Sequence, residues 1–151
     1  MKTNIIAAFP GTGKSYLVRN NKLDRKVVDL DSNAYTQGHD SDGNLASEEF
    51  PGNYIQAIKK QIDRTDVLLI SIHSEVLDAL RREQIKFTVV YPEMELKSEY
   101  ISRFQERQDP SEFIELFNKN WQAILERLQD QKGCKHFVLR SGQHLADLKI
   151  S

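Results

Sequence analysis

A short segment near the start of the chain has the residue types and spacing needed to bind phosphate groups. It reads Ala8-Phe9-Pro10-Gly11-Thr12-Gly13-Lys14-Ser15. Its glycines let the backbone N–H groups of residues 11–15 converge on phosphate oxygens, and a helix beginning near Lys14 adds the positive end of its dipole. In such a loop the lysine reaches the β- and γ-phosphates, and the hydroxyl that follows, here Ser15, reaches Mg²⁺. The segment therefore predicts a P-loop that binds a nucleoside triphosphate.

This P-loop defines the first expected site, with ATP and Mg²⁺ as cofactors. Ala8 stands where the usual pattern has its first glycine, but this position ends a strand and a small residue suffices there. A glycine-rich turn between core elements is the alternative explanation. The residues expected to contact the nucleotide from this segment are Pro10, Gly11, Thr12, Gly13, Lys14, Ser15 and Tyr16.

Two carboxylates follow at the end of the next apolar segment, Val27-Val28-Asp29-Leu30-Asp31. Alternate residues of a strand share a face, so Asp29 and Asp31 are expected to point the same way at the carboxyl end of the strand, where α/β sheets bind ligands. We predict that Asp29 assists Mg²⁺ and that Asp31 orients or deprotonates the acceptor hydroxyl. The alternative is that Asp31 caps a local turn.

A pair of arginines, Arg103 and Arg107, is the third candidate group. They lie four residues apart, on one face of a predicted helix. Guanidinium groups stabilise the charge that spreads over the oxygens of a transferring phosphoryl group, so the helix end at about 103–110 is predicted to act as a lid. A solvated face paired with Glu99 and Glu106 is the alternative.

The elements that must position these residues alternate between short apolar runs and helical patterns, which predicts an α/β fold with a parallel sheet between two helical layers. The helix at 110–130 carries an apolar stripe predicted to pack in the core, with Asp109 as its N-cap. The predicted strands are Asn4–Ala8, Lys26–Leu30, Asp66–Ile72, Lys86–Tyr91 and Lys135–Arg140, and the predicted helices cover 14–20, 52–63, 74–83, 94–107, 110–130 and 143–149.

Composition restricts the class of protein. A length of 151 residues fits a single domain over 1–151, and 21 Lys and Arg against 22 Asp and Glu give no basic excess for nucleic-acid binding. Cys134 has no partner for an internal disulfide, and no apolar run approaches the ~20 residues of a membrane span. The first apolar run is too short for a signal peptide, so the cytoplasm is the expected location.

The third predicted strand lacks an acid at its carboxyl end, where a motor ATPase would carry one. Ser71 and His73 stand there instead, and His73 either contacts a phosphate or acceptor or simply enters the next helix. The missing acid favours a kinase in which the acid of the second strand serves the metal.

Acceptor recognition is expected in the irregular stretch at about 32–51. No Lys or Arg occurs from Val27 to Ile58. This absence lowers the expectation of a phosphorylated or nucleic-acid acceptor, unless Arg64, Arg81 or Arg103 extends to the acceptor site. Three aromatic residues near this stretch are candidates to stack on a base or sugar-like ring, namely Tyr35, Phe50 and Tyr54, and packing of the Phe50-Pro51 corner under the sheet is the alternative. Matches to guanine-binding and D-x-x-G patterns at 21–24 and 40–43 are misplaced for a GTPase.

On the P-loop, the Asp29-Leu30-Asp31 segment and the two arginines, the chain resembles small P-loop kinases, the superfamily that holds adenylate-type nucleotide kinases, shikimate and gluconate kinases, and polynucleotide 5′-kinases. It is also similar to uncharacterised kinases of phage and bacterial genomes. The resemblance implies a cradle for adenine after the fifth strand, at Ser141-Gly142-Gln143. It also implies phosphoryl transfer from ATP to a hydroxyl or phosphate of a small, nucleoside-like or other acceptor.

Two alternatives remain beside a small-molecule kinase. One is a polynucleotide or modified-base kinase, which needs a basic track; the candidates for it are Lys59, Lys60, Arg64, Arg81 and Arg82. The other is a nucleotide-bound regulatory module that hydrolyses ATP slowly or not at all. The sequence leaves open the identity of the acceptor, the choice between ATP and GTP, the oligomeric state and the role of His73.

Overall fold

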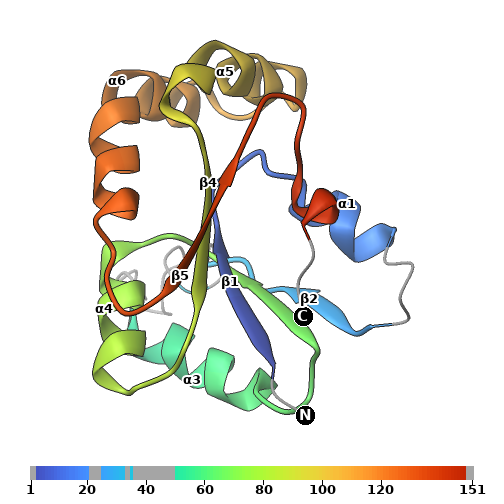
Figure 1. The fold of residues 1–151 in the computed structure, drawn as a ribbon, viewed down its shortest axis with the longest axis vertical. Coiled ribbons are helices and arrows are strands. Elements are labelled where there is room, and N and C mark those ends of the chain that lie inside the picture. The colour runs from blue at the N-terminus through green and yellow to red at the C-terminus, as the bar shows by residue number, and fades with distance from the viewer. Residues whose placement is uncertain (1–2, 21–24, 33–34, 36–49, 149–151) are drawn as a thin grey trace, which may run out of the picture.

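A parallel sheet of five strands forms the centre of the fold in the computed structural model, which describes residues 3–20, 25–32, 35 and 50–148 (Figure 1). The strands are β1 Asn4–Ala8, β2 Val27–Asp29, β3 Val67–Ile70, β4 Thr88–Pro92 and β5 Lys135–Leu139. They lie in the order β2-β3-β1-β4-β5, and every neighbouring pair is parallel. The predicted α/β sheet is confirmed, with strand ends within two residues of those expected.

The helices are also close to the predicted ones, with two differences. The predicted helix over 94–107 divides into a 3₁₀ turn and an α-helix, and the segment at 143–149 forms only a 3₁₀ turn. The described helices are α1 Lys14–Arg19, α3 Gly52–Gln61, α4 Ser74–Arg82, α5 Lys97–Glu106 and α6 Ser111–Gln129, with 3₁₀ turns η2 Met94–Leu96 and η3 Leu145–Asp147. In the described part of the chain, no helix combines the length and apolarity that crossing a membrane requires.

Helices cover both faces of the sheet because the side chains of β1 alternate between two cores. Ile5 and Ala7 pack in the larger core, on the side of α3, α4, α5 and α6. Ile6 and Ala8 face a smaller core closed by Leu17 of α1 and Leu145 of η3. The three layers predicted from the sequence are therefore present, and the second helical layer is thin (Figure 1).

The order of the strands places a crevice at the carboxyl end of β1. The sheet grows from β1 in both directions, to β3 on one side and β4 on the other. Ligands of open α/β sheets bind outside the strand ends at such a switch point. The segment with the P-loop pattern leaves β1 at this point.

Helix α6 differs from its sequence-based prediction in two respects. The helix begins at Ser111 with Pro110 at its N-cap, and the carboxylate of Asp109 accepts hydrogen bonds from Arg107 instead of capping the helix. The apolar stripe is only partly core, since Trp121 is 3% exposed whereas Leu116 is 53% exposed. The first turns of α6 therefore present apolar side chains to a space other than the core.

Tyr54 ties the carboxyl ends of β2 and β3 together from helix α3. Its ring is fully buried, its hydroxyl donates to the carbonyl of Leu30 at 2.5 Å, and the same oxygen accepts the N–H of Ser71 at 3.2 Å. Burial raises the pKa of Tyr54 to about 12, so the hydroxyl stays protonated and able to donate. Tyr54 is thus a structural residue, and the prediction that it could stack on a base is wrong.

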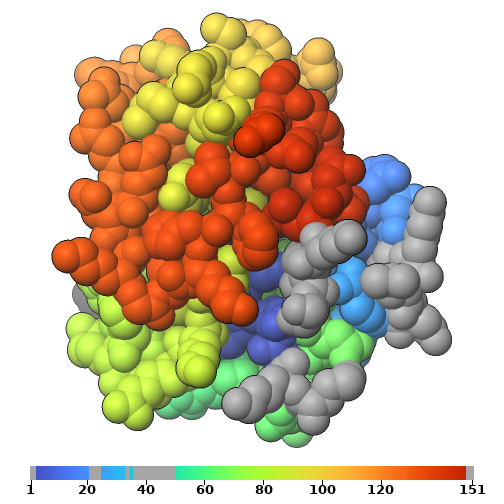
Figure 2. Space-filling view, in the orientation of Figure 1, coloured from blue at the N-terminus to red at the C-terminus, as the bar shows by residue number. Residues whose placement is uncertain are grey.

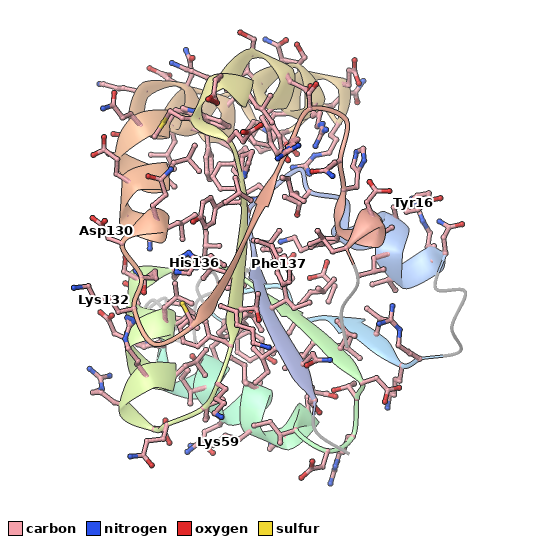
Figure 3. The ribbon with its side chains drawn as sticks, viewed as in Figure 1. Tyr16, Lys59, Asp130, Lys132, His136 and Phe137 are labelled. Carbon is pink, nitrogen blue, oxygen red and sulfur yellow. The ribbon has the colours of Figure 1, made fainter. Side chains whose placement is uncertain are left out.

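Replacing Tyr54 with phenylalanine should destabilise the protein by about 1–3 kcal/mol, because the carbonyl of Leu30 and the N–H of Ser71 lose their shared partner. Urea denaturation of the wild type and the variant measures this difference. Tyr16→Phe is the matched control, since Tyr16 lies on α1 and is 51% exposed (Figure 3). Equal stability of the two variants would contradict the bridging role of Tyr54.

Candidate active site

The P-loop follows β1 with the backbone conformation that its glycines permit. Gly11 and Gly13 have φ angles of 80° and 93°, a region that disfavours other residues. A Cβ atom at Gly11 would lie 3.0 Å from Cε1 of Phe104, so helix α5 also leaves no room for a side chain there. Thr12 is fully buried, and its hydroxyl donates to the carbonyl of Phe9 at 2.7 Å. The loop is therefore held in shape before any ligand binds.

The C-terminal segment braces the other side of the P-loop. The N–H of Leu145 donates to the carbonyl of Thr12 at 2.8 Å, and the side chain of His144 packs on Gly13. Figure 2 shows this red segment lying against the blue helix α1. The chain after β5 and the P-loop thus form one unit, although about 130 residues separate them in the sequence.

A cavity of about 770 Å³ opens beside the P-loop. It brings together five of the predicted site residues, namely Pro10, Lys14, Asp29, Asp31 and Arg107. The other lining residues are Ala8, Leu30, Ser32, Ser71, Ile72, His73, Asp109, Pro110, Glu112, Phe113, Leu116, Phe117, Ile124 and Arg127. One cavity therefore contains the lysine of the P-loop, both carboxylates of the Asp29-Leu30-Asp31 segment and one lid arginine.

Lys14 and the two aspartates form a small charged group at one end of this cavity. Burial lowers the pKa of Lys14, and the carboxylates of Asp29 and Asp31 act in the opposite direction. The side chain of Asp29 reaches solvent, but the cavity walls desolvate it and raise its pKa, while the ammonium of Lys14 lowers it. The site thus places the cation of Lys14 within the electrostatic influence of two carboxylates that line the same cavity.

The strand carrying the aspartates is shorter than expected. β2 ends at Asp29, so Asp31 lies beyond the strand and its direction does not follow from alternation along β2. Both carboxylates still line the same cavity, because the N–H of Leu30 continues to pair with the carbonyl of Leu69 and keeps this segment beside β3.

The two predicted lid arginines have different surroundings. Arg103 donates from Nη1 to the carbonyl of Gly11 at 2.7 Å and from Nη2 to Glu99 at 2.8 Å. Its guanidinium carbon lies 4.3 Å from the centre of the Tyr100 ring. Arg107 lines the cavity and pairs with Asp109 at 2.6 Å. The structure thus places Arg103 beneath the P-loop and Arg107 at the cavity, rather than both over one ligand.

Glu99 connects the P-loop to the predicted adenine cradle. Its carboxylate accepts hydrogen bonds from the hydroxyl of Ser141 at 2.5 Å and the N–H of Gly142 at 3.2 Å, in addition to its bond with Arg103. The hydrogen bond from Ser141, followed by that from Gly142 and the charge of Arg103, lowers the pKa of Glu99. Gln143, the third cradle residue, accepts the N–H of Arg140 through Oε1 at 2.7 Å. Sequence reasoning had placed Glu99 only on a solvated face.

Arg103→Gln should weaken ATP binding roughly tenfold and change kcat less, because the bond to the Gly11 carbonyl supports the loop and is charge-assisted. Arg107→Gln is the matched comparison, and it should lower kcat more than ATP affinity because Arg107 lines the cavity. Isothermal titration with ATP and steady-state kinetics measure the two effects. A loss of kcat at unchanged ATP affinity in Arg103→Gln would contradict the supporting role.

His73 lies at the cavity, at the start of α4. Its Nδ1 and the hydroxyl of Ser71 are 2.9 Å apart, and its ring meets Phe50 edge to face. Burial lowers the pKa of His73, the charge of Glu75 opposes this shift and that of Arg127 adds to it, so the surroundings favour the neutral imidazole. His73 is also the N-cap residue of α4, so the structure agrees with its role at the start of a helix and places it at the cavity as well, and both roles considered for it stay open.

Arg127 is a cavity residue that the sequence did not single out. It belongs to α6, where the apolar stripe dominated the prediction, and it donates to the carbonyl of Ile72 at 3.0 Å and the hydroxyl of Ser74 at 2.7 Å. No local pattern marks it, because its partners lie more than 50 residues away in the sequence.

Several predicted features fall elsewhere. Ser15 and Tyr16 are exposed at the start of α1 and do not line the cavity. Most of the stretch at 32–51, together with the patterns at 21–24 and 40–43, lies outside the described residues. Of that stretch, Ser32 is 5% exposed and lines the cavity, and Tyr35 and Phe50 pack on the ring of Tyr54.

The residues present fit a magnesium ion. Mg²⁺ binds through one or two carboxylates together with water and substrate phosphates, so a full cage of protein ligands is not required. Among the described residues no group of three or more acidic, histidine or cysteine side chains forms a metal cage. Of the two predicted ligands, Asp29 lines the cavity and supplies a carboxylate oxygen suited to this ion, whereas Ser15 stands at the start of α1 outside the cavity lining.

Comparison with known proteins agrees with this fold. No family model and no curated protein sequence matches the chain. Among solved structures it is similar to a gluconokinase from Sinorhizobium meliloti, with a TM-score of 0.51 and 17% identity over 95% of this chain and 85% of that chain. The chain therefore shares the fold of that kinase.

Proposed function

We propose that this chain is a kinase that transfers the γ-phosphoryl group of ATP, with Mg²⁺, to a hydroxyl of a small acceptor. The observation that carries the proposal is the single cavity lined by Lys14, Asp29, Asp31 and Arg107. The fold, similar to that of a gluconokinase, supports it. A cationic lysine beside two carboxylates suits binding of a phosphate chain next to a hydroxyl that must lose its proton.

In this proposal each residue has a distinct task. The backbone of residues 11–15 and Lys14 hold the triphosphate, and Ser15 and Asp29 hold Mg²⁺, which would neutralise charge on the phosphates. Asp31 accepts the proton of the acceptor hydroxyl as that oxygen bonds to the γ-phosphorus. The bond between the γ-phosphorus and the bridging oxygen breaks, and ADP leaves. Arg107 stabilises the charge on the transferring group, so catalysis rests on positioning and electrostatics.

The location of the basic residues supports a small acceptor over a polynucleotide. In the candidate basic track, Lys59 and Lys60 lie on α3 and Arg64 follows that helix. Arg81 and Arg82 are at the end of α4 remote from the cavity. Figure 3 shows Lys59 at the opposite end of the molecule from α5. Lys59 pairs with Glu83 and Arg81 with Asp78, which reduces the charge available for phosphates.

Acceptor-dependent release of ADP tests the proposal. The purified protein is incubated with ATP, Mg²⁺ and a mixture of small metabolites, with Asp31→Asn as the control that keeps the P-loop intact. We expect ADP to form faster with the metabolite mixture than without it, and only in the wild type. Hydrolysis that responds to a protein partner and yields no phosphorylated small product would instead indicate a regulatory module.

A further inference from the structure

Arg127 provides a second positive region in the cavity, apart from Lys14. Its side chain is half-buried, and two bonds from Nη1, to the carbonyl of Ile72 and the hydroxyl of Ser74, fix the guanidinium at the carboxyl end of β3. A guanidinium held in this way loses little entropy when it binds a ligand. Arg127 is therefore a pre-positioned cation at the cavity wall.

The charge of Arg127 is less compensated than those of the other cavity cations. Arg107 pairs with Asp109, and Lys14 faces Asp29 and Asp31. Within the described residues Arg127 makes no ion pair, and Glu75 and Asp78 of α4 act on it only from a distance. A partly desolvated cation without an ion-pair partner is a favourable site for an anion.

The neighbouring side chains suit the same ligand. His73 and Ser71 line the cavity beside Arg127 and provide a neutral ring and a hydroxyl for hydrogen bonds. Helix α6, which carries Arg127, also contributes Phe113, Phe117 and Ile124 to the lining, and the exposed Leu116 extends this apolar wall. A ligand that fills this region needs both an anionic group and apolar surface.

We infer that the acceptor carries a carboxylate or phosphate group, distinct from the hydroxyl that is phosphorylated, which pairs with Arg127 while its hydrocarbon skeleton lies against α6. This inference rests on the proposed function and narrows its acceptor to small anionic hydroxyl compounds. Arg127 then acts as a specificity-determining residue: it sets which acceptor binds, and the hydroxyl is directed toward Asp31.

Binding of simple probes tests the inference without knowledge of the acceptor. The P-loop is first saturated with a non-hydrolysable ATP analogue and Mg²⁺, so that added anions cannot occupy it. Calorimetry or ligand-observed NMR then measures binding of cyclohexanecarboxylate, cyclohexyl phosphate and the neutral cyclohexanecarboxamide. The first two probes distinguish a carboxylate acceptor from a phosphate acceptor, and the amide removes the charge while keeping the ring.

We expect at least one anionic probe to bind about 10- to 100-fold more tightly than the amide, the range for a charge-assisted contact. Arg127→Gln should remove this preference, whereas Arg127→Lys should retain part of it. Ser74→Ala is the structural control, because it removes a bond to Arg127 but leaves the charge, and it should keep the preference.

Three outcomes would overturn the inference. Equal binding of amide and anions to the wild-type protein would do so even if Arg127→Gln did not fold. An anion preference that survives in folded Arg127→Gln would place the anion elsewhere. Failure of the ATP analogue to bind would refute the proposed function as well, whereas nucleotide binding without an anion preference would refute this inference alone.

Discussion

Replacing Lys14 with alanine is expected to lower kcat/KM for phosphoryl transfer by about 10²- to 10³-fold, the loss typical of one preorganised electrostatic donor. Lys14 is the charged P-loop side chain among those that line the cavity, and its charge opposes those of Asp29 and Asp31. Without it the two carboxylates would face the phosphates of ATP unshielded. Both ATP affinity and turnover should therefore fall.

Lys26→Ala is the matched control for this variant. Lys26 is an exposed lysine next to β2 and does not line the cavity, so its loss should leave transfer unchanged. Steady-state kinetics and ATP titration on the three proteins separate the effects. Activity in Lys14→Ala close to that of the wild type would refute the P-loop assignment.

Replacing Asp31 with asparagine should lower kcat by about 10²- to 10⁴-fold, the usual contribution of a general base, and leave ATP affinity unchanged. The amide keeps the size of the side chain but cannot accept the proton of the acceptor hydroxyl. Asp31 lines the cavity and is not part of the P-loop, so the nucleotide should bind as before. Pre-steady-state kinetics should show that the chemical step has slowed.

Asp29→Asn is the comparison that separates the base from the metal ligand. Its activity should be partly restored by high Mg²⁺, since Asp29 is proposed to hold the ion, whereas that of Asp31→Asn should not. If high Mg²⁺ restores Asp31→Asn and not Asp29→Asn, the two roles are exchanged.

The sheet could be predicted from sequence because its strands are buried on both faces. The segments over Ile5–Ala8 and Val67–Ile70 are continuous apolar runs, and a fully covered parallel strand requires this pattern. The P-loop was predictable for a related reason: Gly11 and Gly13 adopt positive φ angles, so local backbone geometry dictates their identity. Burial of a strand and the backbone geometry of a loop each restrict neighbouring residues, so both can be recognised in a short stretch of sequence.

Arg127 and Glu99 could not be found in the same way, because their contacts are not local. Glu99 meets Ser141 across 42 residues, and Arg127 meets Ile72 across 55. Spacing within a helix predicted only that Arg103 and Arg107 share a face. It could not show that Arg103 donates to the Gly11 carbonyl of the P-loop, or that Arg107 donates to Asp109.

The apolar stripe of α6 shows a second limit of sequence patterns. Helical spacing predicts which residues share a face, but not whether that face meets the core or a cavity. Trp121 is buried and donates to the carbonyl of Met94, whereas Phe113 and Leu116, nearer the start of the helix, line the cavity. Hydrophobic residues lining a binding cavity and those in a core have the same periodicity.

Transfer of label from γ-labelled ATP tests the central claim most directly. The wild-type protein and Lys14→Ala are incubated with Mg²⁺ and separate acceptor classes: small hydroxy acids, nucleosides, nucleoside monophosphates, 5′-hydroxyl oligonucleotides and DNA with hydroxymethylated bases. We predict that the wild type alone transfers label, and that the label appears in a small hydroxyl compound. Tight ATP binding with no label in any class would contradict the assignment as a kinase.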